Sequence, residues 1–382
     1  MLKVYCPDCG TQADLTPTNW CCSCGGAWEM IGPEVLDPAS IDPNVTSIWR
    51  YKDFYALDFK NPTVILGAGW TPFLPVTIES RQVWVKPEYF APSASFKDRG
   101  TELMVNILAN QGVKRVAEDS SGNAGSSVAA YAARAGMKAD IFVPAHASPA
   151  KQAQIAIYGA QVHPVPGPRA NAKLAAIAEA EQGVVYASHA YHPGFLQGQT
   201  SVAYEVWEQL GKRAPHWYVV PVGQGVHLLG AWLGFKRLLA SGLIEHMPRM
   251  AAVQAELLAP LCLAFQKGLD HVPGIEPGKP SLAEGLAIAA PARGRRLLEA
   301  VRQSGGTCIT VSEAQIVAAQ TLLAQQGLYV EPTSATAIAA LNQVFQLAGP
   351  QETIVVPLTG SGLKGAPKVG SAGRSDSGEN QR

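Results

Sequence analysis

The stretch that decides the fold is Ser93-Ala94-Ser95-Phe96-Lys97-Asp98-Arg99-Gly100. It offers one amine, Lys97, at what reads as a helix start, with Asp98 and Glu102 where a first turn favours acids. Unpaired backbone N–H groups and partial burial both disfavour an ammonium at such a place. We therefore expect Lys97 to supply a neutral amine, which Schiff-base chemistry needs. Taken alone, the stretch equally fits a surface lysine.

The composition describes a globular protein with no strong charge bias. The chain has 382 residues, of which 47% are hydrophobic and 16% charged, and Lys plus Arg equals Asp plus Glu. This balance gives no indication of nucleic acid or an anionic membrane as a partner. No apolar run approaches the ~20 residues of a membrane span, and the N-terminus lacks a signal-peptide core. The length predicts two domains plus an appendage, and we expect a cytoplasmic enzyme.

Two cysteine pairs predict a zinc-ribbon-like segment over residues 1–30. Cys6 and Cys9 form the first C-x-x-C pair and Cys21 and Cys24 the second, each followed by glycine, with Cys22 as a spare thiol. Four thiolates complete a tetrahedron, so the zinc would be structural, with no position open for water. Disulfides are disfavoured in a cytoplasmic chain. Reduced thiols in a ribbon without metal are the third alternative.

The pattern along the rest of the chain predicts an α/β fold. Residues 31–69, with several prolines, read as a linker arm, and residues 365–382 as a disordered tail. Strands are expected at 82–86, 115–118, 139–143, 161–165, 184–187, 217–222, 250–254, 307–311 and 353–357. Helices are expected near 124–135, 150–158, 169–182, 200–210, 228–241, 258–267, 294–304, 312–326 and 333–347. Alternation of this kind indicates parallel sheets covered by helices.

A second informative stretch, 120–126, joins a strand to a helix. Its small residues let a ligand approach the backbone, and the helix N-terminus offers N–H groups to an anion. Asn123 adds an amide that can bond a phenolic oxygen. A tight capped turn explains the same residues.

The third stretch, 221–230, is again strand, glycine loop and helix. Gly223 and Gly225 allow successive amides to form a nest for a phosphate monoester. The loop lacks the ending of a nucleotide P-loop and the spacing of the dinucleotide fingerprint, so a small phosphate cofactor fits better than a nucleotide.

In the fourth stretch, 358–364, the hydroxyl of Thr359 follows an apolar strand, where α/β sheets gather ligands.

Together these stretches resemble pyridoxal-phosphate enzymes of the tryptophan-synthase-β type (fold type II), and within it the threonine synthases. The resemblance covers residues 70–364. It includes Gly69-Trp70-Thr71-Pro72-Phe73 and Glu331-Pro332-Thr333-Ser334-Ala335 besides the stretches above. It implies a catalytic core with the cofactor between two parallel-sheet domains, the smaller one, about 100–190, inserted in the larger.

The resemblance also implies roles at matching positions. Lys97 would bind the cofactor covalently and move protons at the substrate carbons, and Phe96 would flank the ring. Asn123 would bond the phenolic oxygen, and Thr359 would face the pyridine nitrogen. The cofactor phosphate would be held by the amides of Gly223, Gln224, Gly225, Val226 and His227. The substrate carboxylate would be held by Ser121, Gly122, Asn123 and Ala124.

One departure bears on the substrate. Family members often carry an arginine for the substrate phosphate in an N-P-x-R-x-E-G-Q-K-T-like segment, where this chain has Phe195, and Gln197 replaces the acid. Loss of a bidentate partner would weaken binding of a dianion. Lys86, His189 or His192 could compensate, although each also fits a surface or core position.

The expected function is that of a pyridoxal-phosphate-dependent lyase resembling threonine synthase, which turns O-phosphohomoserine and water into threonine and phosphate. A serine/threonine deaminase or a β-replacement enzyme is the alternative within the family. A non-catalytic protein that binds pyridoxal phosphate or an amino acid is the alternative of another class. The partner is a small amino-acid substrate, and dimers are common in the family.

Overall fold

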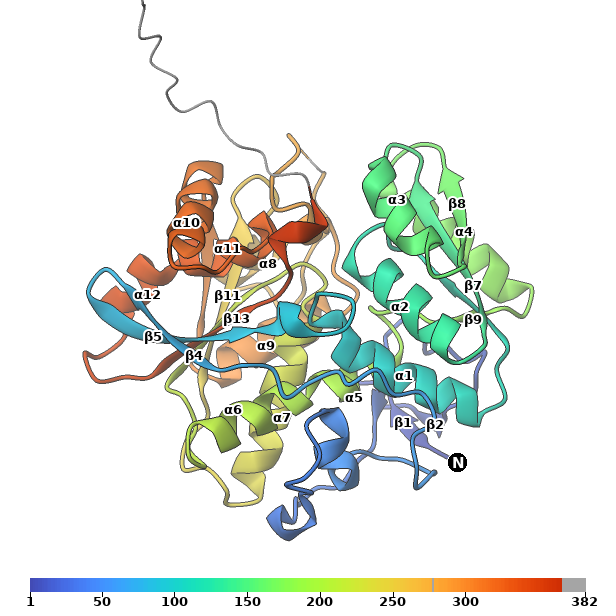
Figure 1. The fold of residues 1–382 in the computed structure, drawn as a ribbon, viewed down its shortest axis with the longest axis horizontal. Helices are drawn as coiled ribbons and strands as arrows, with labels where there is room; N and C mark the ends of the chain where they lie inside the picture. Colours follow the sequence, from blue (N-terminus) through green and yellow to red (C-terminus); the bar gives the residue numbers. More distant parts are fainter. Residues whose placement is uncertain (277, 366–382) are drawn as a thin grey trace, which may run out of the picture.

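The computed structural model of the protein describes residues 1–276 and 278–365. These residues form three sheets, two of them large and mainly parallel (Figure 1). The expected disordered tail, 365–382, lies outside the described residues except for Gly365. Among the described residues, no helix has the length and apolar character needed to cross a bilayer.

The larger sheet has six strands in the order β12-β11-β10-β13-β5-β4. Only β4 runs antiparallel to its neighbour. The strands are β4 (Leu74–Ile78), β5 (Arg81–Pro87), β10 (Trp217–Pro221), β11 (Arg249–Ala255), β12 (Thr307–Val311) and β13 (Ile354–Leu358).

The smaller sheet is wholly parallel, in the order β8-β7-β6-β9. Its strands are β6 (Arg115–Glu118), β7 (Lys138–Pro144), β8 (Gln161–Val165) and β9 (Val185–Tyr186). They lie in the chain between β5 and β10 of the larger sheet. We propose that the domain built on this sheet extends from about residue 100 to about residue 190.

The third sheet, at the N-terminus, consists of β1 (Lys3–Tyr5), β2 (Gln12–Asp14) and β3 (Glu29–Met30).

Helices cover both faces of each parallel sheet, as such sheets require. On β10, Trp217 and Val219 pack toward α10–α12, whereas Tyr218 and Val220 pack toward α6–α9. On the smaller sheet, α1–α3 cover one face and α4 the other. Figure 1 shows the smaller sheet with α2–α4 on one side of the molecule and α10–α12 on the other.

The helices confirm most of the expected ranges to within a few residues, and the nine expected strands are all present. The helices are α1 (Lys97–Asn110), α2 (Asn123–Arg134), α3 (Pro149–Ala156), α4 (Arg169–Glu181), α5 (Pro193–Gln199), α6 (Ser201–Gln209), α7 (Val226–Ala240), α8 (Pro260–Gln266), α9 (Gly294–Gln303), α10 (Glu313–Gln325), α11 (Pro332–Ala339) and α12 (Leu341–Leu347). The sequence did not predict α5, β4 or the strands of the N-terminal sheet.

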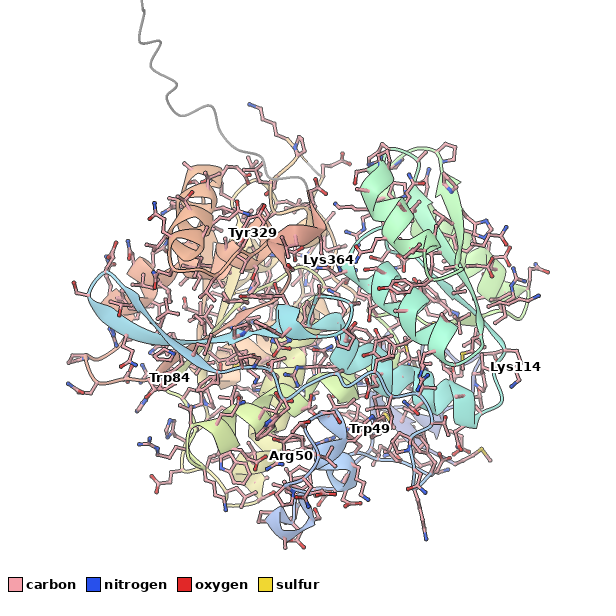
Figure 2. The ribbon with its side chains drawn as sticks, in the orientation of Figure 1. Trp49, Arg50, Trp84, Lys114, Tyr329 and Lys364 are labelled. Atoms are coloured by element: carbon pink, nitrogen blue, oxygen red, sulfur yellow. The ribbon has the colours of Figure 1, made fainter. Side chains whose placement is uncertain are left out.

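The segment 31–69, expected to be a linker arm, is packed against the core over its second half. Its 3₁₀ segment Ile48–Phe54 buries Trp49 and Arg50 (Figure 2). Trp49 donates from its indole nitrogen to Glu102 at 2.6 Å, and Arg50 makes a bidentate pair with Glu208. These bonds to α1 and α6 fix the arm, because a buried guanidinium needs its charge and donors satisfied.

Candidate active site

Lys97 is the first residue of α1 and is half-buried. Its Nζ lies 4.0 Å from the ring centroid of Phe96. Burial lowers the pKa of Lys97 to about 8, an effect that the carboxylate of Glu331 opposes. Near neutral pH, the fraction of Lys97 present as neutral amine is therefore roughly a hundredfold or more higher than that of a free lysine.

The turn before Lys97 is held by a buried carboxylate. Asp98 accepts bonds from the amide and hydroxyl of Ser93 and, at 2.6 Å, from the hydroxyl of Ser127 on α2. Burial raises the pKa of Asp98 in spite of these donors. Asp98 thus joins the lysine turn to the helix that follows the asparagine turn.

The lysine turn also pairs with the chain after β13. The amide of Phe96 donates to the carbonyl of Thr359 at 3.0 Å, and Ser95 forms an antiparallel bridge with Gly360. Lys364 donates from Nζ to the carbonyl of Ser93 at 2.7 Å (Figure 2 labels Lys364). Two of the stretches singled out in the sequence are therefore in direct contact.

Thr359 presents a hydroxyl that is unused within the described part of the chain. The residue is 2% exposed, and its Oγ1 has no hydrogen-bond partner there, while its amide donates to Ser334 at 2.7 Å. An unsatisfied buried hydroxyl costs about 1–3 kcal/mol, so it favours a ligand atom at this position.

The asparagine turn follows β6 and opens α2. Asn123 donates from its side-chain amide to Glu331 at 3.0 Å. No side chain caps α2 at its N-cap residue, Gly122, so the amides of the first turn, from Asn123 and Ala124, are left for a ligand. Ser121 precedes them in the same turn.

The glycine loop joins β10 to α7. Gly225 is its N-cap residue with φ of +73°, a left-handed conformation that favours glycine, and a Cβ there would come within 2.2 Å of Leu297. Gln224 accepts a bond from the amide of Ala292 at 3.0 Å, and Val226 is buried in the core. The side chains of this loop thus point into the protein, and the amides of 223–227 remain to form the expected nest.

His227 closes the loop as a neutral imidazole. Its Nε2 lies 2.9 Å from the hydroxyl of Tyr218 and its Nδ1 3.2 Å from Oε1 of Gln199. Burial lowers the pKa of His227 to about 3. Its ring packs edge-on against Phe96, with the centroids 4.7 Å apart, so the loop adjoins the lysine.

Sequence reasoning missed an acidic group at the carboxyl end of β6. His189 contacts Glu118 through Nδ1 at 2.6 Å, and the hydroxyl of Tyr186 donates to Asp119 at 2.6 Å. Glu118, Asp119 and His189 lie close enough to share a cation. Burial lowers the pKa of His189 to about 3 and raises that of Glu118. In the sequence, the position of Glu118 and Asp119 at the end of an expected strand could have indicated this group.

Glu331 was also missed as a site residue, although its motif was recognised. It precedes α11, and burial raises the pKa of its carboxyl. Its bond to Asn123 brings it to the site.

The residues proposed to replace the missing arginine are engaged elsewhere. Lys86 is fully buried and pairs with Glu205 at 2.9 Å. His189 bonds Glu118, and His192 accepts from the amide of Gly194 at 3.1 Å as the cap of α5. Phe195 is fully buried in the core against Gly100. The ammonium of Lys86 is therefore already satisfied inside the protein, and Phe195 offers no polar side-chain group to a substrate phosphate.

The cysteine cluster differs from the expected set at one position. The sulfurs of Cys6, Cys9, Cys22 and Cys24 lie within 4.8 Å of one another, and Cys21 is outside the group. Cys6 and Cys24 are 3.5 Å apart, and Cys9 and Cys22 are 3.6 Å apart. Four sulfurs at ~2.3 Å from a zinc ion lie about 3.8 Å apart, so the geometry suits zinc.

Comparisons with known proteins agree with this arrangement. The model of the family described as "Pyridoxal-phosphate dependent enzyme" matches residues 64–360. The threonine synthase of Methanocaldococcus jannaschii is 33% identical, covering 94% of this chain and 92% of the relative. The threonine synthase of Methanosarcina acetivorans is 30% identical, covering 95% and 92%.

Solved structures show the same fold. The T.th. threonine deaminase superposes with a TM-score of 0.67 at 25% identity, covering 78% of this chain and 94% of that one. Maize serine racemase gives a TM-score of 0.67 at 22% identity, covering 76% and 88%.

Proposed function

Because this chain belongs to the family of pyridoxal-phosphate dependent enzymes, we propose that it is a lyase that converts O-phosphohomoserine and water into threonine and phosphate. Relatives named threonine synthase, 30–33% identical over most of the chain, support the reaction. The observation that carries the proposal is the backbone hydrogen bond from Phe96 to Thr359. It places the residue before Lys97 beside the residue after β13, whose buried hydroxyl has no partner within the described residues.

The residues present fit pyridoxal phosphate. Lys97 would hold its aldehyde carbon and Phe96 would flank the ring. Thr359 would donate to or accept from the ring nitrogen, which gives its buried hydroxyl a partner. Asn123 would bond the phenolic oxygen, and the amides of 223–227 would hold the phosphate. The cofactor supplies an electron sink for a carbanion at the substrate.

Groups of the protein itself would transfer protons and bind the substrate. The lowered pKa of Lys97 lets its amine take and return protons at the substrate carbons. The uncapped first turn of α2, with Ser121 before it, would bind the substrate carboxylate. A neutral hydroxyl at the ring nitrogen does not enforce its protonation, which suits elimination and hydration.

We propose Arg169 as the partner of the substrate phosphate, in place of the arginine that Phe195 replaces. Arg169 begins α4 and so lies at the carboxyl edge of the smaller sheet, the edge that also carries Asn123 and His189. Burial lowers the pKa of Lys97 and of His189, and the positive charge of Arg169 lowers both further. Its position at that edge and its effect on both pKa values support Arg169 as the partner of the substrate phosphate.

The alternative within the family is a serine/threonine deaminase or a β-replacement enzyme. The observation that favours it is the buried Phe195, because the usual cation for a phosphorylated substrate is absent from that position.

The test is release of phosphate or ammonia by the purified protein with a panel of amino acids. Phosphate from phosphohomoserine supports threonine synthase, and ammonia from threonine or serine supports the deaminase. With phosphohomoserine, Arg169→Gln should raise KM at least tenfold, since a charged bond to phosphate contributes about 1.5–3 kcal/mol. Arg134→Gln, in the last turn of α2, is the control.

We also propose a structural zinc on Cys6, Cys9, Cys22 and Cys24, a homodimeric assembly and a cytoplasmic location. The location is supported by the cysteines, all seven of which are free thiols. Sedimentation of the purified protein tests the assembly.

A further inference from the structure

A cavity of about 580 Å³ lies apart from Lys97, where the N-terminal sheet meets α5, α7 and α9. Its walls include Met30, Leu196 and Leu233, which make it partly apolar. The volume falls within the ~300–1,000 Å³ typical of small-molecule sites. None of the residues assigned above to cofactor, substrate or zinc lines it.

The wall of the cavity carries more cationic than anionic side chains. Glu29 is fully engaged, because it pairs with Arg296 at 2.8 Å and accepts from the hydroxyl of Tyr5 at 2.8 Å. Arg237 and Lys236, on α7, make no ion pair with any carboxylate among residues 1–276 and 278–365. The wall thus carries three cations, Lys236, Arg237 and Arg296, against two carboxylates, Glu29 and Glu34. Arg237 donates long bonds to the Phe54 carbonyl at 3.4 Å and to Gln197 at 3.3 Å.

Gln197 adds a donor without a partner within the described residues, beside Arg237. It is 4% exposed, and its Oε1 accepts a long bond of 3.3 Å from the Arg237 guanidinium. Its Nε2 is buried and finds no acceptor within the described residues. A ligand oxygen near both groups would satisfy the amide and the guanidinium together.

We propose that this cavity is an effector site for a small organic carboxylate. The carboxylate is held by Arg237 and Gln197, and the apolar body lies against Leu196 and Leu233. The site does not depend on which amino acid the enzyme converts.

Helix α5 connects the cavity to the lysine. Gln199, two residues after Gln197, donates to the carbonyl of Phe96 at 3.2 Å and contacts His227 at 3.2 Å. Gly198 lies so close to α1 that a Cβ would come within 2.2 Å of the Arg99 carbonyl. A ligand that shifts α5 therefore moves the backbone that carries Lys97, and its binding changes KM or kcat.

The test is calorimetric titration of the holoenzyme with 3-phenylpropionate, with the neutral 3-phenylpropanamide as a matched probe. Wild type should bind the acid with a Kd below 1 mM and the amide at least tenfold more weakly. Arg237→Gln removes the cation, and Gln197→Glu gives Arg237 an internal partner, so both should weaken binding at least tenfold. Arg213→Gln, which removes a cation at a separate cavity, should leave it within twofold.

Absence of binding by wild type, equal binding of acid and amide, or wild-type affinity in both variants would overturn the site. Binding that leaves KM and kcat unchanged on whichever substrate is active would overturn its regulatory role. Melting temperatures identify a misfolded Arg237→Gln, in which case Gln197→Glu decides. Because the readout is heat of binding, failure of the proposed threonine synthase activity leaves the result interpretable.

Discussion

The side-chain amide of Asn123 donates a hydrogen bond to Oε1 of Glu331 at 3.0 Å and so joins the start of α2, beside the smaller sheet, to the residue before α11, beside the larger one. An asparagine amide carries two N–H donors, so one remains for the phenolic oxygen of the cofactor. Glu331 thereby orients the group that the sequence assigns to the cofactor.

Glu331→Ala should release this amide and raise the Kd for pyridoxal phosphate about tenfold, which corresponds to about 1.4 kcal/mol for one hydrogen bond. Glu331→Gln keeps an acceptor at the same place and should stay within about threefold of wild type. Absorbance titration of the apoenzyme measures both. Wild-type affinity in Glu331→Ala would remove the orienting role.

Thr359→Val should act in opposite directions on the two forms of the enzyme. In the apo form the hydroxyl has no partner within the described residues, so its loss should leave the melting temperature unchanged or raise it. In the holo form the bond to the ring nitrogen is lost, and cofactor affinity should fall by about 1 kcal/mol. Thermal denaturation with and without pyridoxal phosphate checks both, with Thr359→Ser as the control. A destabilised apo form would show that the hydroxyl already has a structural role.

Of the two adjacent cysteines, we expect Cys22 to bind the proposed zinc ion and Cys21 not to bind it. Cys22→Ser should remove the metal, since its sulfur completes the cluster with Cys6, Cys9 and Cys24, while Cys21→Ser should retain about one zinc per chain. Metal analysis of freshly purified, reduced protein gives the answer. Loss of zinc from Cys21→Ser alone would restore the pairing expected from the sequence.

Phe195→Arg should not create a phosphate site. Phe195 is fully buried, so an arginine there buries an unpaired charge and should destabilise the fold by roughly 3 kcal/mol or more. We expect a lower melting temperature and no gain in phosphate release from phosphohomoserine, with Phe195→Leu as the milder control. A stable variant with faster release would show that the side chain reaches the substrate.

The sequence predicted the parallel strands and the four site stretches because each has a local signature. Apolar runs ending in small or hydroxyl residues, such as those before Asn123, Gly223 and Thr359, mark the carboxyl ends of strands in an α/β fold. Lys97 stood out as a lone amine at a helix start.

Other features depend on tertiary contacts. Helix α5 carries Gly194 and Gly198, which disfavour a helix locally, and it is stabilised by its close packing on α1. The two C-x-x-C pairs could not show that Cys22 turns toward the cluster. Glu331 has no local pattern that reveals its bond to a residue more than 200 positions away.

The most direct test of the central claim is reduction of the purified protein with borohydride, followed by peptide mapping. The protein should be yellow as purified or after incubation with pyridoxal phosphate, and reduction should fix the cofactor on a single peptide, at Lys97. Lys97→Ala should give no such peptide. A cofactor fixed on a different lysine, or no label at all after incubation, would contradict the account.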